Sequence, residues 1–168
     1  MDAGAFEAEL ARRLGGATRI AVLGIGDDLN PRDRVGIVAA LFLHALEVPE
    51  VTCYLTGTMP ENFTGALREL GPSHVLMIDA ADLGEAPGSV GIIHPARVRG
   101  QRFSTHAMPL TLVIEYIEEE VGAEVILVGI QPDPLPPTED EPVGFSPAVQ
   151  GGIRRVQDAF SKATRGMW

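Results

Sequence analysis

Residues 74–79 (HVLMID) form a continuous apolar run that ends in the carboxylate of Asp79. A run of this kind is typical of a strand that is buried on both faces of a parallel sheet. Three further apolar runs, at 19–23, 51–55 and 124–130, predict neighbouring strands. We therefore expect a sheet in which 74–79 is an inner, parallel strand.

Segments with helical spacing separate these strands along the chain. Near the beginning, Phe6, Leu10 and Leu14 share one helical face. The same spacing predicts four more helices, at 35–46, 60–70, 109–120 and 147–160. Strands that alternate with helices imply βαβ units. We expect an α/β fold, a three-layer α/β/α sandwich around a mostly parallel, twisted sheet of about five strands. Residues 89–93 form a short strand of this sheet, and the sequence does not specify whether it runs parallel or antiparallel.

Length and composition favour one domain over residues 1–168, because no long polar linker divides the chain. The formal net charge of -10 argues against a nucleic-acid partner, since no basic stripe is present to replace phosphate counterions. Neither a secretory signal nor a run of about 18 apolar residues occurs, so we expect a cytoplasmic protein without membrane contact. The single cysteine, Cys53, leaves no disulfide or multi-cysteine zinc site within the chain.

The connection after the first predicted strand, residues 24–36 (GIGDDLNPRDRVG), begins like a phosphate-binding turn. A dinucleotide fingerprint requires glycine where this sequence has Leu29, and the carboxylates of Asp27 and Asp28 would repel a pyrophosphate. We therefore expect no organic cofactor at this turn. Asn30 is suited to cap the following helix, with Pro31 at its first position.

Ligands of parallel α/β sheets gather beyond the carboxyl ends of the strands. A search of these positions selects Asp33, ahead of the helix at 35–46, and Asp79; to these we add His106, in the loop before the helix at 109–120. Two carboxylates and one imidazole would suit a divalent ion such as nickel or zinc. Structural interpretations remain open, because Asp33 can complement a helix dipole and His106 can pack locally.

Five segments resemble, in sequence and spacing, the hydrogenase maturation proteases, and the resemblance runs from about residue 20 to 160. They are GIGDDLNPRDRVG (24–36), LTGTMPEN (55–62), LMIDAADLGEAPGSV (76–90), STHAMPL (104–110) and LVGIQPD (127–133). These endopeptidases remove a C-terminal extension from the large-subunit precursor of [NiFe] hydrogenases. The resemblance is closest to the branch that serves formate-linked, hydrogen-evolving hydrogenases.

The resemblance assigns roles to the same three residues that the search of strand ends selected. It implies that Asp33, Asp79 and His106 are the catalytic, nickel-contacting residues of a metal-dependent endopeptidase. The nickel would be carried by the partner, the large-subunit precursor, and no organic cofactor is implied. Asp82 is expected to support its loop and Gln131 to line the substrate-binding region, without a catalytic role.

Two departures from the family pattern motivate an alternative function. Arg32 stands where the family carries the first acid of a pair, and residues 55–57 (LTG) replace a common Asp-Gly-Gly. The alternative is a non-catalytic, nickel-sensing chaperone of the same precursor, which would keep the fold and the nickel contacts without proteolysis.

Overall fold

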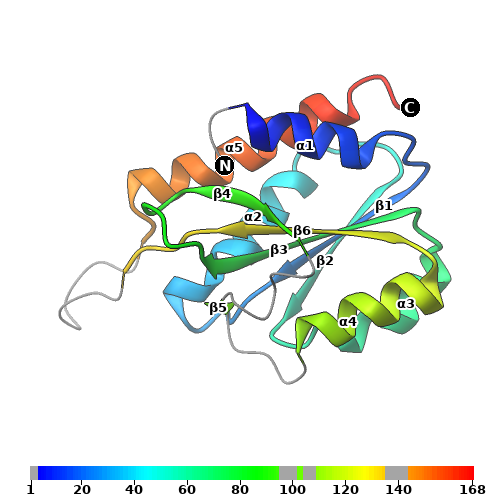
Figure 1. Cartoon of the computed structure of the whole chain (residues 1–168), viewed down its shortest axis with the longest axis horizontal. Helices are drawn as coiled ribbons and strands as arrows, with labels where there is room; N and C mark the ends of the chain where they lie inside the picture. The colour runs from blue at the N-terminus through cyan, green and yellow to red at the C-terminus, as the bar shows by residue number, and fades with distance from the viewer. Residues whose placement is uncertain (1–3, 95–101, 104–108, 135–143) are drawn as a thin grey trace.

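Four parallel strands form most of the sheet in this computed structural model (Figure 1). The structure describes residues 4–94, 102–103, 109–134 and 144–168. The parallel strands are β1 (Ile20–Ile25), β2 (Val51–Gly57), β3 (His74–Asp82) and β6 (Glu124–Ile130). They lie in the order β2-β1-β3-β6, and β4 (Val90–Ile93) closes the far edge antiparallel to β6. A two-residue strand, β5 (Arg102–Phe103), pairs with the end of β3.

Helices cover both faces of the sheet, as Figure 1 shows. One layer contains α1 (Ala5–Leu14), α2 (Val35–His44) and α5 (Pro147–Thr164). The other contains α3 (Thr64–Leu70) and α4 (Leu110–Tyr116), which continues into a π-helical turn, η4 (Ile117–Val121). Short 3-10 turns precede two of the helices: η1 (Pro31–Arg34) and η2 (Pro60–Phe63). The predicted α/β fold, with a mostly parallel sheet between two helical layers, is confirmed.

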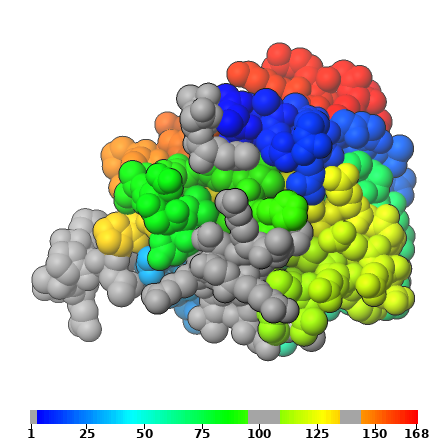
Figure 2. All heavy atoms as spheres, viewed as in Figure 1, coloured from blue at the N-terminus to red at the C-terminus, as the bar shows by residue number. Residues whose placement is uncertain are grey.

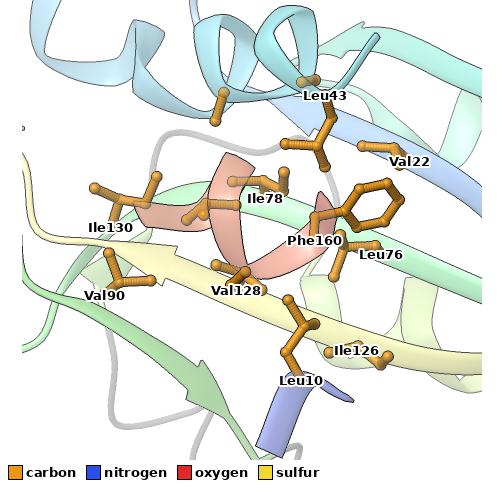
Figure 3. Packing of buried hydrophobic residues seen from close by; sticks show 14 of the residues in the cluster. Leu10, Val22, Leu43, Leu76, Ile78, Val90, Ile126, Val128, Ile130 and Phe160 are labelled. Atoms are coloured by element: carbon orange, nitrogen blue, oxygen red, sulfur yellow. The ribbon is translucent and has the colours of Figure 1, made fainter. Parts of the chain in front are cut away.

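The inner strands bury alternate side chains in two separate cores. On one face, Leu76 and Ile78 of β3 pack beneath α1, α2 and α5, together with Phe160 (Figure 3). On the other face, Val75 and Met77 pack beneath α3 and α4. Because both faces are covered, β3 is apolar at nearly every position, which is the pattern that predicted it.

The structure adds detail to two of the predicted elements, including the strand near residue 90, whose direction the sequence left open. The helix that begins after the first strand opens with η1, in which the N–H of Asp33 donates to the carbonyl of Asn30, three residues earlier, at 2.9 Å. The strand near residue 90 is antiparallel. Its connection from β3 is too short to contain a crossover helix, which a parallel neighbour would require.

The first and last helices lie side by side on the surface, above β4, as the space-filling view shows (Figure 2). An ion pair joins them, with 2.6 Å between Nε of Arg155 and Oε1 of Glu7. None of the helices in the described ranges is long and apolar enough to cross a lipid bilayer.

Candidate active site

The four parallel strands end at one edge of the sheet, which we call the carboxyl edge. The turns that follow β1, β2, β3 and β6 therefore meet there. A hydrogen bond of 3.0 Å from the N–H of Gly26 to the carbonyl of Gly57 joins the first two of these turns. In open α/β sheets this edge is where ligands bind, so it is the region in which the side chains of a functional site should lie.

Asp79 lies near the end of β3 and is fully buried, with 0% of its surface exposed. Its strand neighbour in the register is Gly129 of β6. A carboxylate is seldom fully buried, because the loss of its hydration must be offset by specific partners. Its place at the carboxyl end of the central strand is therefore the strongest single sign of a functional site in the described chain.

Asp33 belongs to η1, the turn that follows β1. Its Oδ2 accepts a hydrogen bond of 3.1 Å from Nδ2 of Asn30. The other side-chain atom of that amide, Oδ1, accepts from the backbone N–H of Arg32 at 3.2 Å. Asn30 therefore caps the turn and orients the Asp33 carboxylate with the same amide group.

Two close backbone contacts bring this turn to the ends of β1 and β3. A Cβ atom on Gly36, in the first turn of α2, would overlap the carbonyl oxygens of Ile25 and Ile78. A Cβ atom on Gly26 would overlap the carbonyl oxygen of Asp33. Both positions therefore require glycine, and η1 packs against β3 as a result. The structure places Asp33 and Asp79 at the same edge, as the search of strand ends predicted.

His106 lies outside the described residues, in the segment that leads to Leu110 at the start of α4. Within the described ranges, no three His, Cys, Asp or Glu side chains come close enough together to hold a metal ion. The three-residue nickel contact of Asp33, Asp79 and His106 therefore stays a prediction.

The arginines on either side of Asp33 are directed to other acceptors. Nε of Arg32 donates a hydrogen bond of 3.0 Å to the backbone carbonyl of Asp133, beyond the end of β6. Arg34 lies 3.3 Å from a carboxylate oxygen of Asp28. Arg32, the departure from the family's acidic residue, thus joins η1 to the loop after β6.

The sequence motifs placed Gln131 in the substrate-binding region but did not identify the residue that it contacts. The residue follows β6 directly, and its Oε1 accepts a hydrogen bond of 2.6 Å from the backbone N–H of Leu83. This bond ties the turn after β6 to the turn after β3. A polar residue immediately after a buried strand was the available signal, but nothing in the spacing identifies Leu83 as its partner.

Cys53 is not a candidate nucleophile in this arrangement. It lies within β2, and burial raises the pKa of its thiol to about 11. The nucleophile of cysteine proteases is a thiolate with a lowered pKa, so a shift in this direction opposes that chemistry.

The parallel sheet, the buried aspartate and the acidic turn packed against its strand agree with the class that the whole sequence defines. Residues 35–163 match the sequence profile of the family described as hydrogenase maturation protease. This chain therefore belongs to the hydrogenase maturation protease family and is an endopeptidase. The matched range contains Asp79 and His106 and begins two residues after Asp33.

Three relatives show how far the likeness extends. A Methanocaldococcus jannaschii protein, provisionally named a hydrogenase maturation protease, is 36% identical over 131 residues, or 73% of this chain and 78% of that protein. The hydrogenase 3 maturation protease of Escherichia coli K12 is 45% identical over 78 residues, or 46% of this chain and 49% of that protein. The crystal structure of HycI, a [NiFe] hydrogenase maturation protease from Thermococcus kodakarensis, has a TM-score of 0.77 at 29% identity, covering 94% of this chain and 99% of that chain.

Proposed function

We propose that this endopeptidase removes the C-terminal extension of a [NiFe]-hydrogenase large-subunit precursor after nickel has been inserted. The observation that carries the proposal is the fully buried Asp79 at the carboxyl edge, with the turn of Asp33 packed against the same strand. The resemblance of the motifs to the branch serving formate-linked, hydrogen-evolving hydrogenases extends the proposal to a precursor of that class.

Nickel enters this proposal as part of the substrate. Asp33, Asp79 and His106 offer two carboxylates and one imidazole, a donor set that suits a borderline divalent ion such as nickel. A divalent ion polarises a peptide carbonyl or lowers the pKa of an attacking water. In this proposal the three side chains contact nickel in the precursor and hold the scissile peptide bond beside it, and no organic cofactor takes part.

Cleavage of a purified precursor tests the proposal directly. The protein is incubated with nickel-loaded and nickel-free precursor, and loss of the C-terminal peptide is followed by intact mass. We expect cleavage of the loaded form only, and a loss of at least about a hundredfold in Asp33→Asn, Asp79→Asn and His106→Gln. Asp82→Asn is the matched control, since Asp82 is exposed and, among the described residues, its side chain accepts a hydrogen bond only from the N–H of Gly84 in its own loop.

Each result of this assay has a definite meaning. A variant that cleaves at the wild-type rate removes its residue from the mechanism, and equal rates with and without nickel contradict recognition of the metal. Stable capture of the loaded precursor without a shortened product would instead favour the nickel-sensing chaperone.

A further inference from the structure

We propose that the side-chain NH2 of Gln131 binds a main-chain carbonyl oxygen of the precursor beside Asp79. This inference rests on the proposed function and adds a substrate-binding residue to it. It is carried by the position of Gln131 in the sheet, by the orientation of its amide and by the bonds that hold its segment.

Backbone hydrogen bonds extend the sheet through Gln131. Its N–H donates to the carbonyl of Ser89 at 2.9 Å, and its carbonyl accepts from the N–H of Gly88 at 2.9 Å. The alternation of side chains along β6 therefore continues to this residue. Gln131 is buried, with 8% of its surface exposed, so its side chain is held within the protein rather than extended into solvent.

Register places Gln131 and Asp79 on the same face of the sheet. Asp79 is paired with Gly129, and Gln131 follows Gly129 by two residues, which is one full period of a strand. Two residues along a strand and one strand across correspond to about 8 Å between Cα atoms. A peptide that lies at the carboxyl edge next to Asp79 therefore comes within reach of a glutamine side chain.

The hydrogen bond to Leu83 fixes which way the amide points. A backbone N–H can only donate, so the atom of Gln131 that faces Leu83 at 2.6 Å is the oxygen, Oε1. The NH2 group must then point away from Leu83. It forms no hydrogen bond with the described residues, and it is not sealed from solvent. A donor is thus presented at the carboxyl edge.

The segment that carries Gln131 is fixed on its other side as well. The backbone carbonyl of Asp133 accepts from Arg32, and Oδ2 of Asp133 accepts a hydrogen bond of 2.9 Å from the N–H of Ser146. These bonds connect the segment to η1 and to the start of α5. A donor that is held in place before the ligand arrives loses little conformational entropy on binding.

The charge around the donor favours a neutral acceptor. The chain has a formal net charge of -10, so an anionic group that approaches this edge would be repelled. A neutral amide donor and a peptide carbonyl form a hydrogen bond without such repulsion. A main-chain carbonyl of the precursor therefore fits this position.

Two substitutions at Gln131 separate substrate binding from a purely structural role. Gln131→Met removes both halves of the amide, whereas Gln131→Glu keeps an oxygen for the N–H of Leu83 and removes the NH2 donor. We expect both to raise the Kd for nickel-loaded precursor and to lower kcat/KM by about five- to tenfold, the usual size of one lost neutral hydrogen bond. Gln157→Met is the control, because Nε2 of Gln157 donates to the carbonyl of Phe42, at the other end of α2.

Wild-type Kd in Gln131→Glu with weakened binding in Gln131→Met would overturn the inference, because the residue would then serve only to hold Leu83. A second measurement removes the effect of the added charge. In protein labelled with ¹⁵N, the side-chain NH2 signals of Gln131 should shift when the precursor is added, and unchanged signals would overturn the inference. If the wild type binds the precursor without cleaving it, the proposed function fails, while the Kd values and the NH2 signals still decide the role of Gln131.

Discussion

Asn30 uses one amide for two purposes. Its oxygen caps η1 and its nitrogen donates to the carboxylate of Asp33. Orientation of a metal-contacting carboxylate by such a hydrogen bond is a common way to fix the geometry of a metal site. The effect of Asn30 on cleavage and its effect on stability can therefore be separated by choosing which half of the amide is removed.

Asn30→Ala removes both hydrogen bonds. We expect cleavage of nickel-loaded precursor to fall about five- to tenfold, because the Asp33 carboxylate loses its orienting donor. We also expect the free energy of unfolding in urea to fall by about 1 kcal/mol, because the cap of η1 is lost.

Asn30→Asp is the matched variant, since its carboxylate still accepts from the N–H of Arg32 but has no donor for Asp33. Its stability should remain within about 0.5 kcal/mol of the wild type, while its cleavage rate should be at least as low as that of Asn30→Ala. Wild-type cleavage by Asn30→Asp would contradict the orienting role.

Single residues of the site were predictable only as far as residue type and strand position allow. Asp33 and Asp79 were found because carboxylates stand out beside buried strands, and the structure places both at the carboxyl edge. The bond between Gln131 and Leu83 joins residues 48 positions apart, so it depends on the packing of two turns that sequence spacing does not encode.

The position of α2 relative to β1 and β3 depends on the absence of a side chain at Gly36. Gly36→Ala should lower the free energy of unfolding by more than about 2 kcal/mol, because the new methyl group overlaps backbone carbonyl oxygens that cannot rotate away. It should also reduce cleavage, because η1 is displaced from β3. Urea unfolding and precursor cleavage measure the two effects.

Gly65→Ala provides the control for this prediction, because Gly65 is likewise the second residue of its helix, α3. A Cβ atom there meets no other atom within 4 Å. We expect unchanged cleavage and a gain of up to about 1 kcal/mol in stability, since alanine is the better helix former. Equal destabilisation by both substitutions would show that close packing at Gly36 is not the cause.

The contact between α1 and α5 should depend on pH. A hydrogen bond from Arg155 lowers the pKa of the Glu7 carboxyl from 4.5 to about 2. A carboxyl whose pKa is lower in the folded state stabilises the fold above pH 4.5, and this contribution is lost as the pH falls from 4.5 to about 2. Glu7→Gln should therefore cost up to about 1 kcal/mol at neutral pH and almost nothing at pH 2.

Urea unfolding of the wild type and Glu7→Gln at several pH values measures this difference. Glu9→Gln is the comparison for an ion pair within one helix, because Glu9 binds Arg12, three residues along α1, and this bond also lowers the pKa of the Glu9 carboxyl. A difference between the wild type and Glu7→Gln that stays constant across pH would contradict the ion pair as its source.

Helices and strands could be predicted from the sequence where a segment pairs and packs along its whole length. The apolar runs located β1, β3 and β6, because these strands are covered on both faces. They also located β2, an edge strand whose residues are mostly half-buried. The two-residue β5 carries no such pattern, since it exists only through pairing with the end of β3. The direction of β4 also follows from tertiary pairing with β6 rather than from its own residues.

The same strands contribute side chains to both hydrophobic cores, one on each face of the sheet. This arrangement determines how the whole molecule should unfold. Neighbouring residues of β3 point alternately into one core and the other, so loss of either helical layer exposes part of the same strand. We expect one cooperative thermal transition, as for a single domain over residues 1–168. Scanning calorimetry checks this, because the calorimetric and van't Hoff enthalpies should agree. Two resolved transitions would contradict the single domain.

Because α5 is long, it separates the single tryptophan from the carboxyl edge, and this residue can serve as a fluorescence reporter. The helix begins beside Ser146, which is bonded to Asp133 near the carboxyl edge, and its 18 residues extend about 27 Å. Figure 1 shows the chain ending at the opposite end of the sheet, where Trp168, the single tryptophan, lies. Trp168 is 42% exposed, so its indole contacts both protein and water. Its emission should therefore change when this end of the chain unfolds and stay unchanged when a tryptophan-free precursor peptide binds at the carboxyl edge. One fluorophore thus measures folding independently of occupancy.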